Sequence, residues 1–193
     1  MRYRRGWVLS MLSLVMTGCV SSYVVPLLPH VTYEELLAAR SARPVVLTVE
    51  FQRNGAPHRG ANASVRERVT KVLTTSKVFS VISVERLENA DELKIVLNNV
   101  ADLGDAAGKG ALTGLTFGAA GSTVTDGYVM TATFTRAGQP PVEKVYRHAL
   151  LSTVGSAKGP EGLKPMGVMD AFDQVVQDLV LNLILDLQKA ELL

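Results

Sequence analysis

A two-residue alternation that places apolar side chains at every second position constrains the fold of this chain more than any other feature. In residues 128–135 one side of the alternation carries Tyr128, Met130, Ala132 and Phe134. Residues 45–52 follow the same pattern, with Val45, Leu47, Val49 and Phe51. A period of two is that of a β-strand with one buried face. The chain therefore predicts a sheet that needs other elements to cover one side.

Three further stretches have the composition of strands. They cover residues 78–85, 93–97 and 142–154, and the last follows a loop at 137–141 that contains one glycine and two prolines. A loop of this kind between two apolar runs is typical of an antiparallel hairpin. The sequence thus predicts about five strands.

Helical periods occur between and after these strands. Residues 64–76 begin with the capping-box pair Ser64 and Glu67, and their apolar face consists of Val65, Val69, Val72 and Leu73. A shorter helix is expected from a second capping box, Thr32 with Glu35, to about Arg40. A long C-terminal helix is predicted by the apolar stripe of Val168, Phe172, Val175, Val176, Leu179, Leu183, Ile184 and Leu187.

The expected fold class is α+β, a mainly antiparallel sheet with helices packed on one face and the order β-α-β-β-β-β-α. Residues 44–193 are predicted to form this domain. Residues 20–31 contain two prolines and no helical or strand period. We therefore expect residues 19–43 to be a tether with a short helix.

Cys19 is the only cysteine, and it follows a short apolar segment. Three arginines precede residues 7–16, and about ten apolar residues are too few to span a bilayer. This pattern predicts a signal peptide over residues 1–18. The run ending in Met16, Thr17, Gly18 and Cys19 resembles the lipobox of bacterial lipoproteins. The resemblance implies cleavage between Gly18 and Cys19 and acylation of the Cys19 thiol.

Lipidation would fix the location of the protein. Two or three acyl chains anchor durably where one is marginal, since each buried methylene contributes roughly 0.8 kcal/mol. Val20 follows the cysteine, in place of the aspartate that favours inner-membrane retention in Gram-negative lipoproteins. The resemblance therefore implies an outer-membrane protein whose domain faces the periplasm.

Composition argues against several other classes. Without the three arginines of the signal peptide, 17 basic residues stand against 18 acidic ones, a net charge of −1. A basic surface for nucleic acid is not expected. His30, His58 and His148 are scattered and no second cysteine exists, so no metal site is predicted and no cofactor is expected. An ordinary surface or sheet-edge role is expected for His148.

The acidic residues have structural explanations. They occur as helix-start pairs, a turn pair and a solvated loop pair: Glu34/Glu35, Asp170/Asp173, Asp91/Glu92 and Asp102/Asp105. No nucleophile motif is present. We therefore expect no enzyme. A hydrolase with an unrecognised site stays as an alternative, and a concave pocket with convergent polar side chains would favour it.

The glycine-rich segment at 102–122 is long for a connection between strands. Gly110, Gly114 and Gly118 recur every fourth residue and flank Leu115 and Phe117. Three interpretations are open: an internal element covering the sheet, a surface for a partner or for self-association, and a membrane-dipping segment. Under the second and third, these five residues are the contact residues.

The order of elements behind a lipobox is similar to that of small periplasmic lipoproteins of the TolB amino-terminal-like group, which includes domains of the curli-secretion, PelC and LpoB types. The similarity covers roughly residues 44–193. The sequence favours a lipid-anchored, non-catalytic tether or adaptor that binds another envelope component. The alternative is an oligomeric accessory of an outer-membrane export or assembly system.

Overall fold

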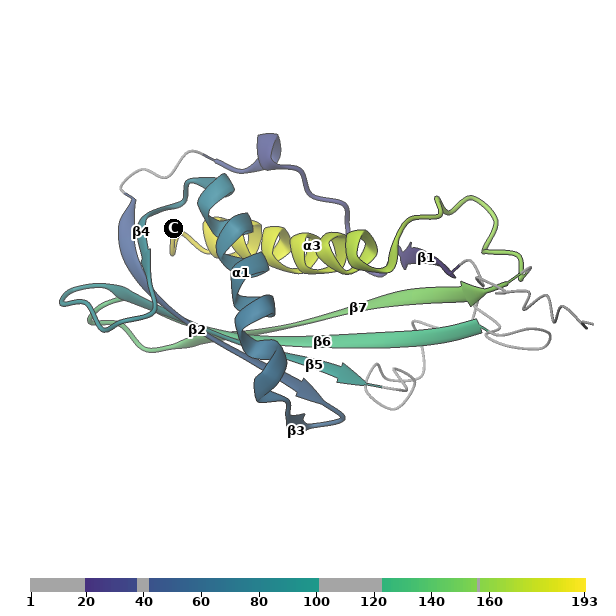
Figure 1. The fold of residues 1–193 in the computed structure, drawn as a ribbon. Coiled ribbons are helices and arrows are strands. Elements are labelled where there is room, and N and C mark those ends of the chain that lie inside the picture. The colour runs from purple at the N-terminus through teal and green to yellow at the C-terminus, as the bar shows by residue number, and fades with distance from the viewer. Residues whose placement is uncertain (1–19, 38–41, 101–122, 156) are drawn as a thin grey trace, which may run out of the picture.

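The computed structural model describes residues 20–37, 42–100, 123–155 and 157–193. One mixed sheet dominates this part of the chain (Figure 1). Its strands are β1 (Val20–Val25), β2 (Arg43–Arg53), β3 (Ala56–Pro57), β4 (Phe79–Ser83), β5 (Asp91–Val100), β6 (Thr123–Thr135) and β7 (Val142–Val154). The order across the sheet is β1-β7-β6-β5-β2-β3, and β4 pairs with the first residues of β2.

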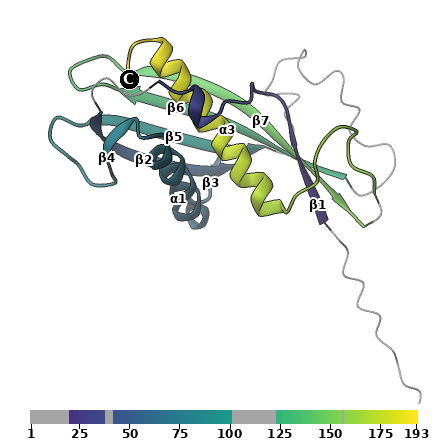
Figure 2. The same cartoon turned by 90° about the horizontal axis from the view of Figure 1, so that it is seen from above.

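Two helices, α1 (Arg59–Ser76) and α3 (Val168–Lys189), lie on the same face of the sheet (Figure 2). β2 is parallel to β4 and β5, and the remaining pairs are antiparallel. The predicted α+β class, with a mostly antiparallel sheet and helices on one side, is confirmed. The described sheet has two strands beyond the expected five, β1 and β3.

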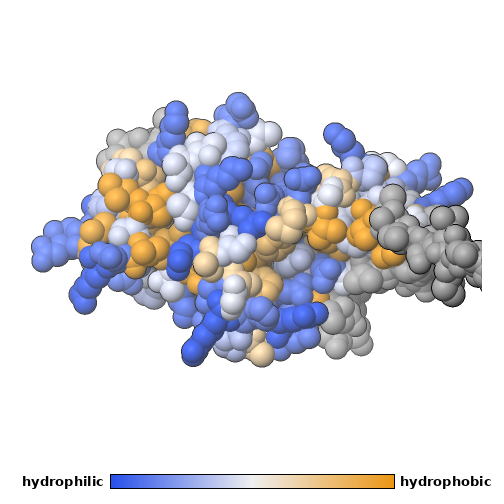
Figure 3. Space-filling view, viewed as in Figure 1, coloured by the Kyte–Doolittle hydropathy of each residue, from blue (hydrophilic) through white to orange (hydrophobic). Residues whose placement is uncertain are grey.

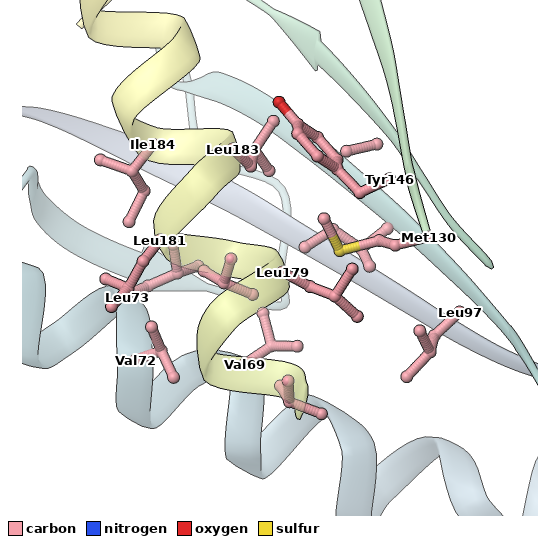
Figure 4. Close-up of a cluster of buried hydrophobic side chains, with 14 of the residues drawn as sticks. Val69, Val72, Leu73, Leu97, Met130, Tyr146, Leu179, Leu181, Leu183 and Ile184 are labelled. Atoms are coloured by element: carbon pink, nitrogen blue, oxygen red, sulfur yellow. The ribbon is translucent and has the colours of Figure 1, made fainter. Parts of the chain in front are cut away.

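The core lies between the sheet and the helices (Figure 4). The alternating residues predicted for the buried face of β6, Tyr128 to Phe134, are 8% exposed or less. On α1 the predicted apolar face is also the buried one, and it packs against α3. Each fully buried apolar side chain stabilises the fold by roughly 1.5–3 kcal/mol, so this layer dominates stability.

The middle of α3 is buried on all sides. Every residue from Asp178 to Ile184 is buried, which exceeds the stripe predicted from the sequence. A helix enclosed in this way needs a cover on its outer side. The segment after β1 provides it: Val31 belongs to the core, and Asn182 Nδ2 donates to the Pro29 carbonyl at 3.0 Å.

The structure differs here from the tether expected over residues 20–31. Residues 20–25 form β1, which pairs with β7 through the whole of its length, and the following residues pack on the domain. Edge pairing does not require a strict alternation, because the backbone supplies the hydrogen bonds. Apolar residues that are unusual in a solvated linker, such as Val25 and Leu28, are thereby explained.

Two helix starts also differ from expectation. α1 begins at Arg59, and Ser64 lies inside it, where its hydroxyl accepts from Arg68. Asn62 Oδ1 accepts the backbone N–H of Phe51 at 2.9 Å, so the extra turn contacts β2. In the described part of the helix predicted at 32–40, residues 32–37, there is a single 3-10 turn, Tyr33–Glu35. In this turn Glu35 accepts the Thr32 N–H at 3.1 Å.

A second, smaller apolar cluster lies on the other face of the sheet, at the β1 edge. It contains Tyr23, Val25, Ala149 and Leu151, and Leu163 from the loop before α3 packs against it. Gly159 in that loop approaches the Tyr23 ring so closely that an added Cβ would lie 2.1 Å from it. A side chain at this position would displace the loop from β1.

Candidate functional site

The residues that the sequence predicts as lipidation, cleavage or contact sites lie outside the described part of the chain. This applies to Gly18 and Cys19 and to the glycine-segment residues Gly110, Gly114, Leu115, Phe117 and Gly118. Their roles stay predictions. The structure does describe the strand ends to which both segments connect.

These connection points share one end of the sheet. Val20 pairs with Val154, Thr123 pairs with Thr153, and Val100 pairs with Gly127. We call this end, defined by Val20, Val100, Thr123 and Val154, the anchor end. The lipidation motif and the glycine-rich segment therefore both join the domain at the anchor end.

A pocket of about 640 Å³ lies at the opposite end of the domain. It is bounded by the C-terminal end of α3, the first residues of β2 and β4, and the hairpin between β6 and β7. Its lining consists of Leu37, Arg43, Val78, Phe79, Asp91, Arg136, Gln188, Lys189, Glu191, Leu192 and Leu193. We call this the far-end pocket.

Asp91 of β5 links β2 and the β6–β7 hairpin at the far-end pocket. Its carboxylate is 1% exposed and accepts Arg43 Nε at 3.1 and 3.3 Å, and it also accepts the Ala137 N–H at 3.0 Å. Arg43 donates further to the Asn89 carbonyl at 3.0 Å. The expectation that Asp91 lies in a turn is wrong, because β5 begins two residues earlier than predicted and carries Asp91 on its buried face.

Gln188 links α3 to Leu37 at the far-end pocket. It is 7% exposed, accepts the Leu37 N–H at 3.0 Å and donates to the Leu37 carbonyl at 2.7 Å. Arg136 Nη1 donates to the Glu191 carbonyl at 3.5 Å. Lys189 has no hydrogen-bond or ion-pair partner among the residues that the structure describes.

The lining of the far-end pocket combines apolar and charged side chains. The lining residues in the described ranges include no serine, threonine, cysteine or histidine. Its buried polar side chains, Asp91 and Gln188, are already engaged by structural donors and acceptors. What the pocket offers a ligand is apolar surface from Phe79 and Leu192, together with the cationic groups of Arg136 and Lys189.

His148 occupies a different position from the one expected. It is 1% exposed, and its Nδ1 accepts the Ala149 N–H at 2.9 Å, so its Nε2 donates to Asp178 Oδ2 at 3.1 Å. The expectation of a surface or sheet-edge role is wrong because β1 covers the edge of β7 and α3 covers its face.

The carboxylate of Asp178 lies between two histidines. Its Oδ1 is buried and makes no hydrogen bond within the described ranges, and the exposed ring of His30 is 3.6 Å away. Within the residues described, no group of three or more His, Cys, Asp or Glu could hold a metal ion. The contacts of Asp178 with His148 and His30 tie β7 and the segment before η1 (Tyr33–Glu35) to α3.

Two tyrosines have perturbed pKa values. Burial raises the pKa of Tyr146, and so does its hydrogen bond to Asp186 Oδ2, which it donates at 2.7 Å. Burial also raises the pKa of Tyr128, with a smaller effect from Asp126. Both phenols stay neutral at physiological pH, and the Tyr146–Asp186 contact is a further link between β7 and α3.

Only part of this site could be predicted from local patterns in the chain. Asp91 stands in alternation with Leu93, Ile95 and Leu97, so a charged residue at a buried register could have indicated a partner. No pattern linked Arg43, Arg136 and Lys189, because they come from three distant segments.

No helix in the described ranges is both long and apolar enough to cross a bilayer.

No protein-family model matches the sequence, and no curated protein matches it. The structure is similar to a minor lipoprotein from Acinetobacter baumannii, with 8% identity over 77% of this chain and 94% of that chain and a TM-score of 0.41. It is also similar to rare lipoprotein B from Shewanella oneidensis, with 10% identity, coverage of 77% and 93%, and a TM-score of 0.34.

A PelC variant from Paraburkholderia phytofirmans, described as a dodecamer, matches with 13% identity, coverage of 84% and 95%, and a TM-score of 0.34. The expected likeness to PelC-type proteins is thus confirmed as a structural similarity. At these TM-scores no functional residue is transferred from any of the three proteins to this chain.

Proposed function

We propose that this chain is a lipid-anchored lipoprotein of the outer membrane whose periplasmic domain binds another envelope component without catalysing a reaction. One observation carries the proposal. β1 begins at Val20, directly after the lipidation motif, whereas the far-end pocket lies at the other end of the same sheet. In this proposal the domain separates an attachment end from a binding end.

The mechanism is confinement. β7 spans 13 residues between the two ends, which at 3.3 Å per residue separates them by about 40 Å. Because residues from Val20 onward pack on the domain, the anchor is followed by no free linker. Confinement of this kind raises the effective concentration of the pocket for partners at the same membrane.

The far-end pocket favours a partner that presents an acidic group next to an apolar side chain. Arg136 and Lys189 supply positive charge at the rim, and Phe79 and Leu192 supply apolar lining. An Arg guanidinium binds a carboxylate with two parallel hydrogen bonds, which gives such a contact direction.

Lipid anchoring is tested by Cys19→Ser. We expect the variant to leave the outer-membrane fraction, because it can no longer be acylated. Membrane fractionation with detection of the mature and precursor forms measures this. A variant that stays in the outer-membrane pellet would show that lipid is not the anchor.

Partner binding is tested with a photoreactive amino acid placed at Lys189 in intact cells. Lys94 is the matched control, since it is an exposed lysine on the outer face of β5. We expect a defined crosslinked species from position 189 and none from position 94, and we expect Lys189→Glu to abolish capture by a crosslinker at position 136. Equal crosslinking from both lysines would contradict the far-end pocket as the binding site.

The glycine-rich segment is a second proposed contact. Leu115 and Phe117, with Gly110, Gly114 and Gly118, would meet a partner or the membrane at the anchor end, where β5 ends and β6 begins. Phe117→Asp is expected to leave the thermal unfolding of the domain unchanged and to abolish crosslinking from position 115. Global unfolding of this variant would instead indicate that the segment belongs to the core.

A second candidate function is that of an oligomeric accessory in export or assembly. The observation in its favour is the outer edge of β4, which is unpaired in the described sheet. Val81 within β4 and Val84 directly after it are 52% and 61% exposed. Exposed apolar edge strands are typical sites of strand addition between chains. Native mass measurement of the acylated protein in detergent tests this, and a strict monomer would contradict it.

A further inference from the structure

Four large apolar side chains are solvent-exposed at the anchor end. Val20 is 46% exposed, Val154 39%, Val168 45% and Met169 59%. Figure 3 shows apolar residues gathered at both ends of the face in view. Single exposed apolar residues are normal on a protein surface, whereas a group at one end requires an explanation.

The backbone places Val20 and Val154 on one face of the sheet. Val154 lies in alternation with Leu150 and Ser152, whose side chains face α3, and Val20 is the register partner of Val154. Successive side chains of a strand point to opposite faces, so Val20 and Val154 project on the side of the sheet that carries α3.

The first turn of α3 lies beside this strand pair. Met166 and Ser22 exchange backbone hydrogen bonds of 2.9 Å in both directions, as in an antiparallel bridge. Val168 follows Met166 by two residues and begins α3. We call the four residues Val20, Val154, Val168 and Met169 the apolar rim.

Charge near the apolar rim is balanced. Lys158 and Lys164 in the loop before α3 are exposed, and so are Glu161 and Asp170. Two positive and two negative groups give no net attraction for anionic headgroups. The chemistry of the apolar rim therefore matches the neutral boundary between headgroups and acyl chains.

The covalent attachment decides the occupant of this surface. Adjacent Cα atoms are about 3.8 Å apart, so acyl chains on Cys19 would enter the bilayer within one residue of the apolar rim. We infer that the apolar rim is a second membrane contact, in which Val20, Val154, Val168 and Met169 insert into the lipid interface next to the acylated cysteine. This inference rests on the proposed function.

Such seating gives the domain a fixed orientation. A lipid alone would allow the domain to tilt freely, whereas a contact that includes β1, β7 and α3 holds the sheet with its anchor end at the membrane. The far-end pocket is then held away from the lipid surface, where a partner can reach it.

The test uses tryptophan as a depth reporter. The one tryptophan of the chain, Trp7, lies in the predicted signal peptide, so the mature protein carries no background fluorescence from this residue. Met169→Trp and Val168→Trp place a reporter in the apolar rim. Val84→Trp is the matched control, because Val84 is 61% exposed against 59% for Met169 and follows β4 at the far end.

Each acylated mature variant is reconstituted into phosphatidylcholine vesicles with and without brominated acyl chains, and flotation verifies that it is bound. We expect brominated lipid to quench the fluorescence at positions 169 and 168, with a blue-shifted emission, and to leave position 84 unquenched. Addition of anionic lipid is expected to leave the quenching unchanged.

The outcomes separate the two proposals. Floating protein without quenching at positions 168 and 169 overturns the membrane contact and leaves the lipid anchor intact. Equal quenching at positions 169 and 84 also overturns it, because the domain would then lie flat on the vesicle. Protein that does not float contradicts lipid anchoring itself.

Discussion

Removal of the Asp91 carboxylate is expected to destabilise the domain by about 3 kcal/mol. This loss of stability is the sum of two hydrogen-bonding contributions. A charge-assisted bond of the kind that Arg43 makes contributes about 1.5–3 kcal/mol, and water recovers some of this because the Arg43 side chain is 36% exposed. The bond from the Ala137 N–H contributes about 1 kcal/mol, since this residue is exposed and its N–H can be hydrated.

The assay is thermal unfolding of the mature protein followed by circular dichroism. For a chain of this size 1 kcal/mol shifts Tm by about 2–4 °C, so Asp91→Ala should lower Tm by roughly 6–12 °C. Glu92→Ala is the matched control, because this neighbouring acid is exposed, and surface changes usually stay within about 0.5 kcal/mol. Equal Tm values for the two variants would refute the role assigned to Asp91.

Three other predictions concern the packing around α3. His148→Ala should lower the free energy of unfolding by about 3 kcal/mol in denaturant, because it leaves the buried Asp178 without its donor. His30→Ala, at an exposed ring, should lower it by less than about 0.5 kcal/mol. Similar losses for the two variants would contradict the assigned geometry. Leu183→Ala should cost about 2–5 kcal/mol through loss of core contacts, and a change below 1 kcal/mol would argue against the packing of α3. The contribution of Tyr128 and Tyr146 to stability should be constant below about pH 10 and should fall above it. The reason is that their raised pKa values keep protons on the folded state that the unfolded state releases. A titration of Tm on the alkaline side checks this, and Tyr146→Phe should weaken the dependence.

The elements with internal periodicity were predictable because their pattern reports burial directly. The alternation around Met130 and the apolar stripe around Leu183 each require one covered face, whatever covers it. β1 has no such pattern. It is a strand because β7 offers it an unpaired edge, which is a property of a segment more than a hundred residues away.

Dependence on distant segments also explains why two residues of the site were mispredicted. His148 and Asp91 each stand at positions where a local pattern of polar residues predicted exposure, and each is buried because distant segments supply a donor or acceptor. A buried polar side chain is stable only when it is paired, and the partner cannot be read from neighbouring residues.

The sequence by itself determined the signal peptide and lipidation motif as predictions, and it determined the α+β class, since both depend on local patterns of charge and hydrophobicity. Only the tertiary structure decided that Val20 begins a strand instead of a linker, that the connections of Cys19 and the glycine-rich segment share one end of the sheet, and that Arg136 and Lys189 meet at the other. These placements depend on strand pairing and helix packing between segments that are far apart in the chain. Each such contact stabilises the fold only after the whole sheet has formed.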